Sequence, residues 1–96
     1  MIIKAITAGG TNAIVSASRV RNYLGIFNQS ITATVYIAFD TAAVAAATAG
    51  QLTLGPLGST GVPASFVWDG GNSQNVPTQA INMIASAGAT TVTIIE

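Results

Sequence analysis

The sequence predicts an all-β protein: an antiparallel, jelly-roll-like β-sandwich of about seven or eight short strands. Two observations lead to this prediction. Short stretches rich in β-branched and aromatic residues alternate between apolar and polar positions, and Gly, Pro, Asn and Asp turn signals separate them. No stretch shows a long helical periodicity. Because 96 residues are enough for one domain at most, the sandwich is expected to span residues 1–96 as a single domain.

The N-terminal strands are predicted from β-prone residues on either side of a glycine pair. Residues 2–8 are expected to form the first strand, which ends at Gly9 and Gly10, and residues 11–17 the second. A Gly-Gly turn suits a β-hairpin because glycine adopts positive φ without steric cost. The sequence therefore predicts that these two strands pair with each other.

The clearest alternation lies in residues 20–28 and 34–39. Each segment has one apolar face and a second face that carries an aromatic residue. In the first segment, one face carries Val20, Leu24 and Ile26, and the other carries Arg21, Tyr23 and Phe27. In the second segment, one face carries Val35, Ile37 and Phe39, and the other carries Thr34, Tyr36 and Ala38. Because the two segments are adjacent in the sequence, they are predicted to form an antiparallel pair.

The second half of the chain contains four further predicted strands, in residues 51–57, 64–68, 79–85 and 90–95. Turn signals separate them, and in the last strand Val92 and Ile94 are expected to face the core. The alanine-rich stretch 41–49 is expected to be a loop with at most one helical turn, packed flat against a neighbour. So short a segment is marginal as a helix on its own.

Charge is scarce, which points to assembly. Only 6% of the residues are charged, against roughly 25% in an ordinary soluble domain, and the formal net charge is zero. Such a surface lacks the repulsion that keeps monomers apart, so much of it is expected to be covered by other subunits. The strands at the two ends of the sequence are β-prone with almost no charge, so they too are expected to be paired or covered.

Nucleic acid is not expected as a partner. The chain has three basic residues, too few for the six or more phosphate contacts that typically dominate such affinity. Arg19 and Arg21 are instead expected to be two side chains on one strand face.

The residue types predict no enzyme, no cofactor and no metal. Cysteine and histidine are absent, which removes disulfides and the usual zinc sites. Of the three acids, Asp40 and Asp69 occupy turn-like positions, where the carboxylate usually bonds the nearby backbone. No serine has a recognisable base beside it in the pattern. The repeated glycines Gly55, Gly58 and Gly61 could be mistaken for a phosphate-binding loop, but the Lys-Ser/Thr pair of such a loop does not follow them. We interpret them as turn residues of an ordinary loop.

No membrane segment is predicted. The apolar run 31–49 is nearly long enough to cross a bilayer, but Asp40 lies at its centre. A carboxylate there costs about 2.5–3.5 kcal/mol on insertion scales. The threonines and the strand-like first half of the run also argue against a membrane helix, and no secretory signal is visible.

Three aromatic residues, Tyr23, Tyr36 and Trp68, allow a second interpretation. In a coplanar, exposed row they would form a sugar-stacking platform, as in glycan-binding β-sandwich modules. The alternative is that they fill the core or subunit interfaces, where aromatic residues are enriched. The segment from Asn28 to Ser30 also matches a glycosylation acceptor, a pattern that is common by chance.

The order of several segments resembles small bacteriophage virion structural proteins. An arginine-led strand that ends in Asn (residues 21–28) precedes a Tyr-x-Ala-Phe strand (residues 35–39). Three more segments follow in the same order: residues 52–56, Trp68-Asp69-Gly70 and residues 76–81. The resemblance extends over residues 19–96 and ends at residues 91–96, with departures at the alanine-rich stretch and at residues 58–61.

The resemblance implies a β-sandwich virion component, and a capsid decoration (cement) protein is the leading hypothesis. Its expected partners are further copies of itself, with a trimer favoured, and the major capsid or other virion proteins. Its expected location is the virion, assembled in the bacterial cytoplasm. The alternatives are a tail, neck or fibre-base subunit, and a glycan-binding module for host attachment. The residues predicted to form interfaces are Tyr23, Phe27, Tyr36, Trp68, Ala43, Val44 and Ala46.

Overall fold

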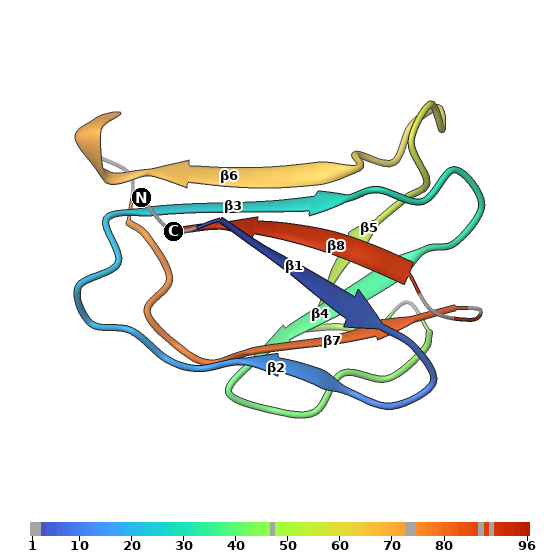
Figure 1. The fold of residues 1–96 in the computed structure, drawn as a ribbon, viewed down its shortest axis with the longest axis horizontal. Coiled ribbons are helices and arrows are strands. Elements are labelled where there is room, and N and C mark those ends of the chain that lie inside the picture. Colours follow the sequence, from blue (N-terminus) through green and yellow to red (C-terminus); the bar gives the residue numbers. More distant parts are fainter. Residues whose placement is uncertain (1–2, 47, 73–74, 87, 89) are drawn as a thin grey trace.

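The chain folds into a β-sandwich, as the sequence predicts. The computed structural model describes residues 3–46, 48–72, 75–86, 88 and 90–96. Within them, eight strands form two four-stranded antiparallel sheets that pack face to face (Figure 1). In spatial order, sheet 1 contains β1 (Ile3–Ala8), β8 (Thr90–Ile95), β3 (Tyr23–Asn28) and β6 (Ser65–Asp69). Sheet 2 contains β2 (Ala13–Val15), β7 (Ile81–Ala85), β4 (Val35–Phe39) and β5 (Leu52–Leu54).

The strand pairing is nested, which is the topology of a jelly roll. The central pair β4–β5 is a hairpin, and around it β3 pairs with β6, β2 with β7, and β1 with β8. The outermost pair places Ile3 opposite Ile95. Two further ladders, β3–β8 and β4–β7, join these pairs into the two sheets. The chain therefore behaves like one long double-stranded ribbon wrapped around a core.

This topology corrects two predictions of strand pairing. Residues 2–8 and 11–17 do not form a hairpin, because β1 lies in sheet 1 and β2 in sheet 2. The antiparallel pair predicted from segments 20–28 and 34–39 does not form either, since β3 and β4 also lie in different sheets. In both cases the turn signal was correct, but the chain uses the turn to cross between sheets.

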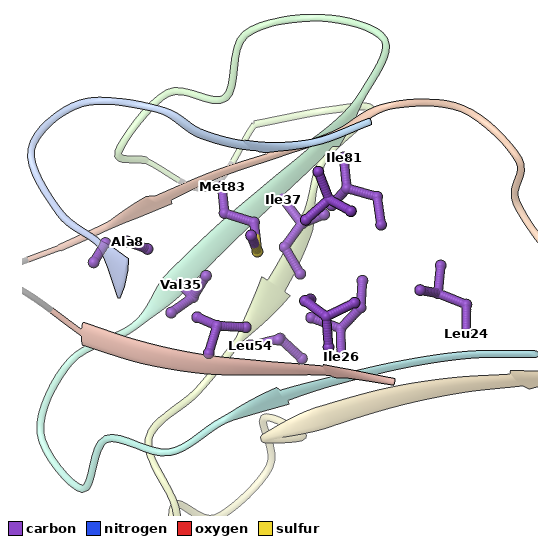
Figure 2. Close-up of a cluster of buried hydrophobic side chains, with 12 residues drawn as sticks. Ala8, Leu24, Ile26, Val35, Ile37, Leu54, Ile81 and Met83 are labelled. Atoms are coloured by element: carbon purple, nitrogen blue, oxygen red, sulfur yellow. The ribbon is translucent and has the colours of Figure 1, made fainter. Parts of the chain in front are cut away.

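The predicted alternation is confirmed by burial. The side chains between the sheets form one apolar core, with Leu24 and Ile26 of β3 facing Val35 and Ile37 of β4 (Figure 2). Complete burial of one such side chain contributes about 1.5–3 kcal/mol. The buried members of the core are Ala8, Val15, Leu24, Ile26, Val35, Ile37, Leu54, Ile81, Met83, Ala85, Val92 and Ile94.

Three local features differ from or complete the prediction. Strand β3 begins at Tyr23, so Val20 lies outside it and is 91% exposed rather than on the apolar face. Residues 41–49 contain no helical turn in their described part and form a loop. A short 3₁₀ turn, η1 (Gly70–Asn72), follows β6, where a tight turn was expected.

Candidate interaction surface

The outer face of sheet 1 is a broad surface with almost no charge. Residues opposite one another in an antiparallel ladder share a face, so the register identifies its members. One row across the four strands is Ala5, Thr93, Phe27 and Ser65, and the row beside it includes Ile95, Gly25 and Val67. Among the described side chains, the face consists of Ala5, Thr7, Tyr23, Gly25, Phe27, Ser65, Val67, Asp69, Thr91, Thr93 and Ile95.

Only one of these positions, Asp69 at the edge, is charged, and its Oδ1 accepts the N–H of Gly71 at 2.9 Å. Asp69 therefore bonds the backbone of the following turn, as the sequence predicted. Ala5, Thr7, Thr91 and Val67 are exposed. The outer face of sheet 1 is thus open to solvent or to a partner.

Two aromatic rings lie across the middle of this face. A Cβ at Gly25 would be 2.5 Å from Cε2 of Phe27 and 3.3 Å from Cε1 of Tyr23. The rings of Phe27 and Tyr23 therefore cover Gly25, which is buried although it points outward. Because glycine has no side chain, both rings lie low on the sheet instead of projecting from it. Two predicted interface residues are thus brought together on one surface.

The outer face of sheet 2 is partly covered by the chain itself. Alternation along β4 and β7 points Ala38 and Asn82 outward, yet they are 0% and 8% exposed. The loop between β4 and β5 runs along this side of the sheet, beneath β7 and β2 in Figure 1. Asn12 attaches the loop to the sheet, because its Nδ2 donates to the Ala43 carbonyl at 3.1 Å and its Oδ1 accepts the Ala43 N–H at 2.8 Å.

The three predicted interface residues in this loop differ from one another. Ala43 is 3% exposed and packs within its own domain, whereas the sequence predicts that this loop packs against a neighbour. Val44 and Ala46 are exposed. The Gln51 side chain holds this part of the loop, since its Oε1 accepts the Val44 N–H at 2.7 Å and its Nε2 donates to the carbonyls of Val44 and Ala46. Val44 and Ala46 are thus accessible to a partner, whereas Ala43 is not.

The other two aromatic positions are separate from the pair on sheet 1. Trp68 lies opposite Leu24 and therefore on the inner side of sheet 1. It packs edge-on against Phe39 of sheet 2, with ring centroids 6.0 Å apart and an 84° interplanar angle, and stacks on Phe66 at 6.1 Å. Tyr36 lies on the outer side of sheet 2, opposite Thr53 and Ile84. Trp68, Tyr23 and Tyr36 thus lie on three different sheet faces and form no common platform.

Arg21 is buried in a cluster of hydrogen bonds, not on a strand face with Arg19 as predicted. Its guanidinium donates to the carbonyls of Ser16, Pro77 and Gln79 at 2.8–3.1 Å. Its Nε lies 3.2 Å from Oε2 of Glu96, in an ion pair whose side chains are 0% and 11% exposed. The loops before β3 and before β7 meet the end of β8 here, at the end of the sandwich where C marks the terminus in Figure 1. Two of the six charges thus neutralise each other internally.

Asp40 also has a structural role. It adopts positive φ (59°) just after β4, and its Oδ1 accepts the N–H of Ala80 at 2.9 Å, while its own N–H donates to the Ala80 carbonyl. The carboxylate thus bonds the backbone, as the turn-like position suggested. The partner, however, is 40 residues away in the sequence, before β7, and not in the same turn.

The opposite end of the sandwich is organised by a second buried polar side chain. Asn28 is 0% exposed, and its Nδ2 donates to the carbonyls of Ala33, Leu54 and Gly55 at 2.9–3.4 Å, while its Oδ1 accepts the Ser30 N–H. The amide is therefore inaccessible in the folded protein, so the segment from Asn28 to Ser30 does not present a glycosylation acceptor. The loop that contains Gly55, Gly58 and Gly61 lies beside Asn28 and has positive φ at Gly58 and Gly61. This loop and the loop after β3 lie at the right in Figure 1.

The described part of the chain offers no obvious site for a small ligand. It contains no pocket, and no three of its acidic residues lie close enough to hold a metal ion. No helix within it is long and apolar enough to cross a membrane. Of the two outer sheet faces, that of sheet 1 is the larger, because its strands have five or six residues and those of sheet 2 have three or five.

Comparisons with known proteins identify no family for this chain. The chain matches no family model, and the searches of curated proteins and of solved structures found no match.

Proposed function

We propose that this protein is a non-enzymatic structural subunit of a bacteriophage particle and acts as a capsid decoration protein. The observation that carries the proposal is the outer face of sheet 1, which spans four strands and, among its described side chains, has a single charge at its edge. A decoration protein reinforces a shell by burying apolar and neutral surface between subunits. Such a face loses little hydration energy when it is covered, because it has almost no charge to desolvate.

The contacts of the charged residues support the same role, because four of the six bond to other groups of the chain. Arg21 and Glu96 pair with each other, and Asp40 and Asp69 bond backbone N–H groups. A surface this neutral provides neither a basic patch for nucleic acid nor an acidic patch for cations. Contact with another neutral protein surface is the association that it favours.

The jelly roll adds support at the level of the fold. Virus shell subunits commonly use this topology, although sugar-binding domains and small-barrel enzymes use it as well. The sugar-binding alternative depended on an exposed, coplanar row of Trp68, Tyr23 and Tyr36. Because Trp68 packs inward on Phe39 and Phe66 and the two tyrosines lie on opposite outer faces, nothing in the structure favours that alternative.

The number of copies per particle tests the proposal. Quantitative mass spectrometry of virions purified from the phage that encodes this chain measures the ratio of the chain to the major capsid protein. A decoration protein is expected at about one copy for each shell subunit or for every few shell subunits. A few copies per particle would indicate a tail, neck or fibre-base subunit instead, and absence from the purified virion would reject a structural role in the particle.

A further inference from the structure

We infer that β6, an edge strand of sheet 1, pairs antiparallel with β6 of a second copy across a two-fold axis at Val67. The two copies of sheet 1 then form one continuous eight-stranded sheet. The inference goes beyond the proposed function, because it concerns an edge strand and not the outer face of sheet 1. A two-fold contact closes at two copies, so it predicts a dimer and not the trimer that the resemblance favours.

Among the described strands, β6 is the edge strand without a protecting feature. The edge strands are β1 and β6 in sheet 1, and β2 and β5 in sheet 2. Proteins commonly keep edge strands short or place lysine or proline in them, because unpaired N–H and C=O groups bind other strands. Strands β2 and β5 have three residues each, and β1 contains Lys4. Strand β6 has five residues without lysine, arginine or proline, and no described segment runs along its side away from β3 (Figure 1).

Two hydrogen bonds show which backbone groups of β6 are used within sheet 1. The Asn28 N–H donates to the Ala64 carbonyl at 2.8 Å, and the Gly70 N–H donates to the Asn22 carbonyl at 2.9 Å. Both bonds continue the register of the β3–β6 ladder. Hydrogen-bonded pairs alternate with non-bonded pairs in an antiparallel ladder, so every second residue counted from Ala64 bonds β3.

The residues between these positions direct their backbone groups away from β3. By the alternation, Phe66 and Trp68 bond β3, whereas the N–H and C=O groups of Ser65 and Val67 point to the open edge. The spacing of these groups is that of an extended strand, so an added strand satisfies them with correct geometry. The chemistry of this edge therefore selects a β-strand as the partner.

The side chains of β6 select a second copy among possible strands. The sequence Ser-Phe-Val-Trp-Asp has the same order of residue classes in both directions: polar, aromatic, valine, aromatic, polar. Centring the antiparallel pair on Val67 pairs all five residues and makes the two valines a hydrogen-bonded pair, as the direction of their backbone groups requires. Phe66 then lies opposite Trp68 of the second copy on both sides of the axis, and aromatic pairs are favourable cross-strand neighbours.

The two aromatic rings gain burial from this pairing. Phe66 and Trp68 lie on the inner side of sheet 1, stack with ring centroids 6.1 Å apart, and are only half-buried. They border the core at its edge, so a strand added beside β6 covers part of their remaining exposed surface. Aromatic side chains contribute large apolar areas to interfaces. The same two residue types from the second copy complete the cover.

The single charge of β6 is also placed compatibly. In the register centred on Val67, Asp69 lies opposite Ser65 of the second copy, which has a neutral hydroxyl. The two carboxylates are then four residues apart along the paired strands, or about 13 Å. This separation exceeds the Debye length of about 10 Å at 0.1 M salt, so repulsion between them is largely screened.

Cysteine crosslinking tests both the pair and its register, because the chain has no native cysteine. Val67→Cys places two thiols opposite each other, at the Cα separation of about 5.5 Å that a disulfide spans. Ser65→Cys is on the same face of the same strand, but in this register its two copies are about 13 Å apart. Under mild oxidation at about 0.5 mM protein, a concentration suited to a weak contact, Val67→Cys is expected to form the covalent dimer at least about tenfold faster.

The crosslinking rates are corrected for accessibility, because Ser65 is less exposed than Val67. Each rate is divided by the rate at which the same thiol reacts with a small-molecule disulfide. Equal corrected rates would contradict the register. No crosslinking of Val67→Cys, at a position that is 42% exposed, would overturn the inference.

Hydrogen exchange of the unmodified chain supplies the second test. A five-residue contact is smaller than a standard interface, so a dissociation constant of about 0.5 mM is expected. Exchange at the Ser65 and Val67 amides should therefore be about threefold slower at about 2 mM chain than at about 0.02 mM. The Phe66 and Trp68 amides already bond β3 and should change less. Exchange at Ser65 and Val67 that does not depend on concentration would overturn the inference.

Two matched substitutions separate the edge from the face of sheet 1. Val67→Lys places two positive charges opposite each other at the axis, so the dissociation constant is expected to rise at least about tenfold. Thr91→Lys makes the same change at an exposed position of β8, on the same outer face but away from the edge, and is expected to leave the constant unchanged. Equal effects of the two substitutions, or no effect of Val67→Lys, would contradict pairing through β6.

This inference and the proposed function fail in distinguishable ways. Crosslinking and hydrogen exchange concern contact between copies of the purified chain, whereas the number of copies in the virion concerns the role in the particle. A chain that is abundant in virions but does not pair through β6 would retain the decoration function and lose this inference. A chain that pairs through β6 but is absent from virions would do the opposite.

Discussion

The two sheets of this sandwich have similar inner faces and different outer faces. The outer side of sheet 2 is partly covered by the loop after β4, which Asn12 and Gln51 hold in place. The outer side of sheet 1 has no equivalent cover over Thr91, Thr93 and Val67 in the described part of the chain. A small domain with few charges thus covers one side with its own backbone and leaves the other open. The outer face of sheet 1 is therefore the sheet face on which a partner could pack.

The largest expected effect comes from a charge under the loop. Ala43→Asp buries a carboxylate at a position that is 3% exposed, so we expect the free energy of unfolding to fall by about 3 kcal/mol. Urea denaturation measures this change. Ala46→Asp, in the exposed part of the same loop, is the control and should change stability by less than about 0.5 kcal/mol. Similar losses in both variants would show that the loop does not seal sheet 2.

Releasing the loop without adding charge should cost less. Asn12→Ala removes both hydrogen bonds to Ala43 and is expected to destabilise the protein by about 2 kcal/mol. Asn12→Asp keeps an acceptor for the Ala43 N–H and should lose about half as much. Hydrogen exchange should become faster in β7 and β4 but not in β8. Uniform acceleration in both sheets would mean that the loop supports the whole sandwich and not one face.

The open face has its own steric test. Gly25→Ala places a methyl group against the Phe27 ring, and the overpacking is expected to cost about 1.5 kcal/mol. Gly10→Ala, where nothing lies within 4 Å of the added atom, should be nearly neutral. In a Phe27→Leu background the cost of Gly25→Ala should fall, which a double-mutant cycle by thermal unfolding would measure. An unchanged cost would show that the ring does not cover Gly25.

The smallest effect is expected at Gln51. Its side-chain bonds to Val44 and Ala46 are exposed, so Gln51→Ala should cost only about 0.5 kcal/mol. The more sensitive readout is hydrogen exchange at the Val44 amide, which should accelerate when its acceptor is removed. Gln29→Ala, an exposed glutamine after β3, is the control and should leave that amide unaffected. Unchanged exchange at Val44 would mean that Asn12 alone holds the loop.

Strand positions and inward faces were predictable from the sequence, whereas strand partners were not. Alternation in β3, β4, β7 and β8 identified the buried side chains correctly because period-two burial is a local property. Pairing is non-local: Gly9 and Gly10 mark a change of direction, and no local signal distinguishes a hairpin from a crossing between sheets. The predicted hairpin at these glycines was therefore wrong although the turn was correct.

The polar side chains that organise the two ends were missed for a related reason. Arg21 and Asn28 bind mainly backbone carbonyls, most of them in distant segments. Because nearly any residue type can supply a backbone carbonyl, the sequence does not identify these partners. The alternating pattern places Arg21 on a strand face because it continues past Tyr23, where β3 begins, toward the N-terminus. Among the predicted interface residues, Tyr23 and Phe27 both lie beside Gly25 on one outer face, Tyr36 lies on the opposite outer face, and Trp68 packs inward.

The nested pairing also determines when the protein acquires its structure during synthesis. Among the described strands, only β4 and β5 are neighbours in the sequence that pair with each other. Strand β1 pairs with β8, whose Ile95 lies opposite Ile3. On the ribosome the first strand is thus made early and has no partner until the last strand has left the exit tunnel. Pairing over such separations is slow, because loop closure must precede the contacts that reward it. We therefore expect sheet 1, with its neutral outer face, to be completed only after translation of β8.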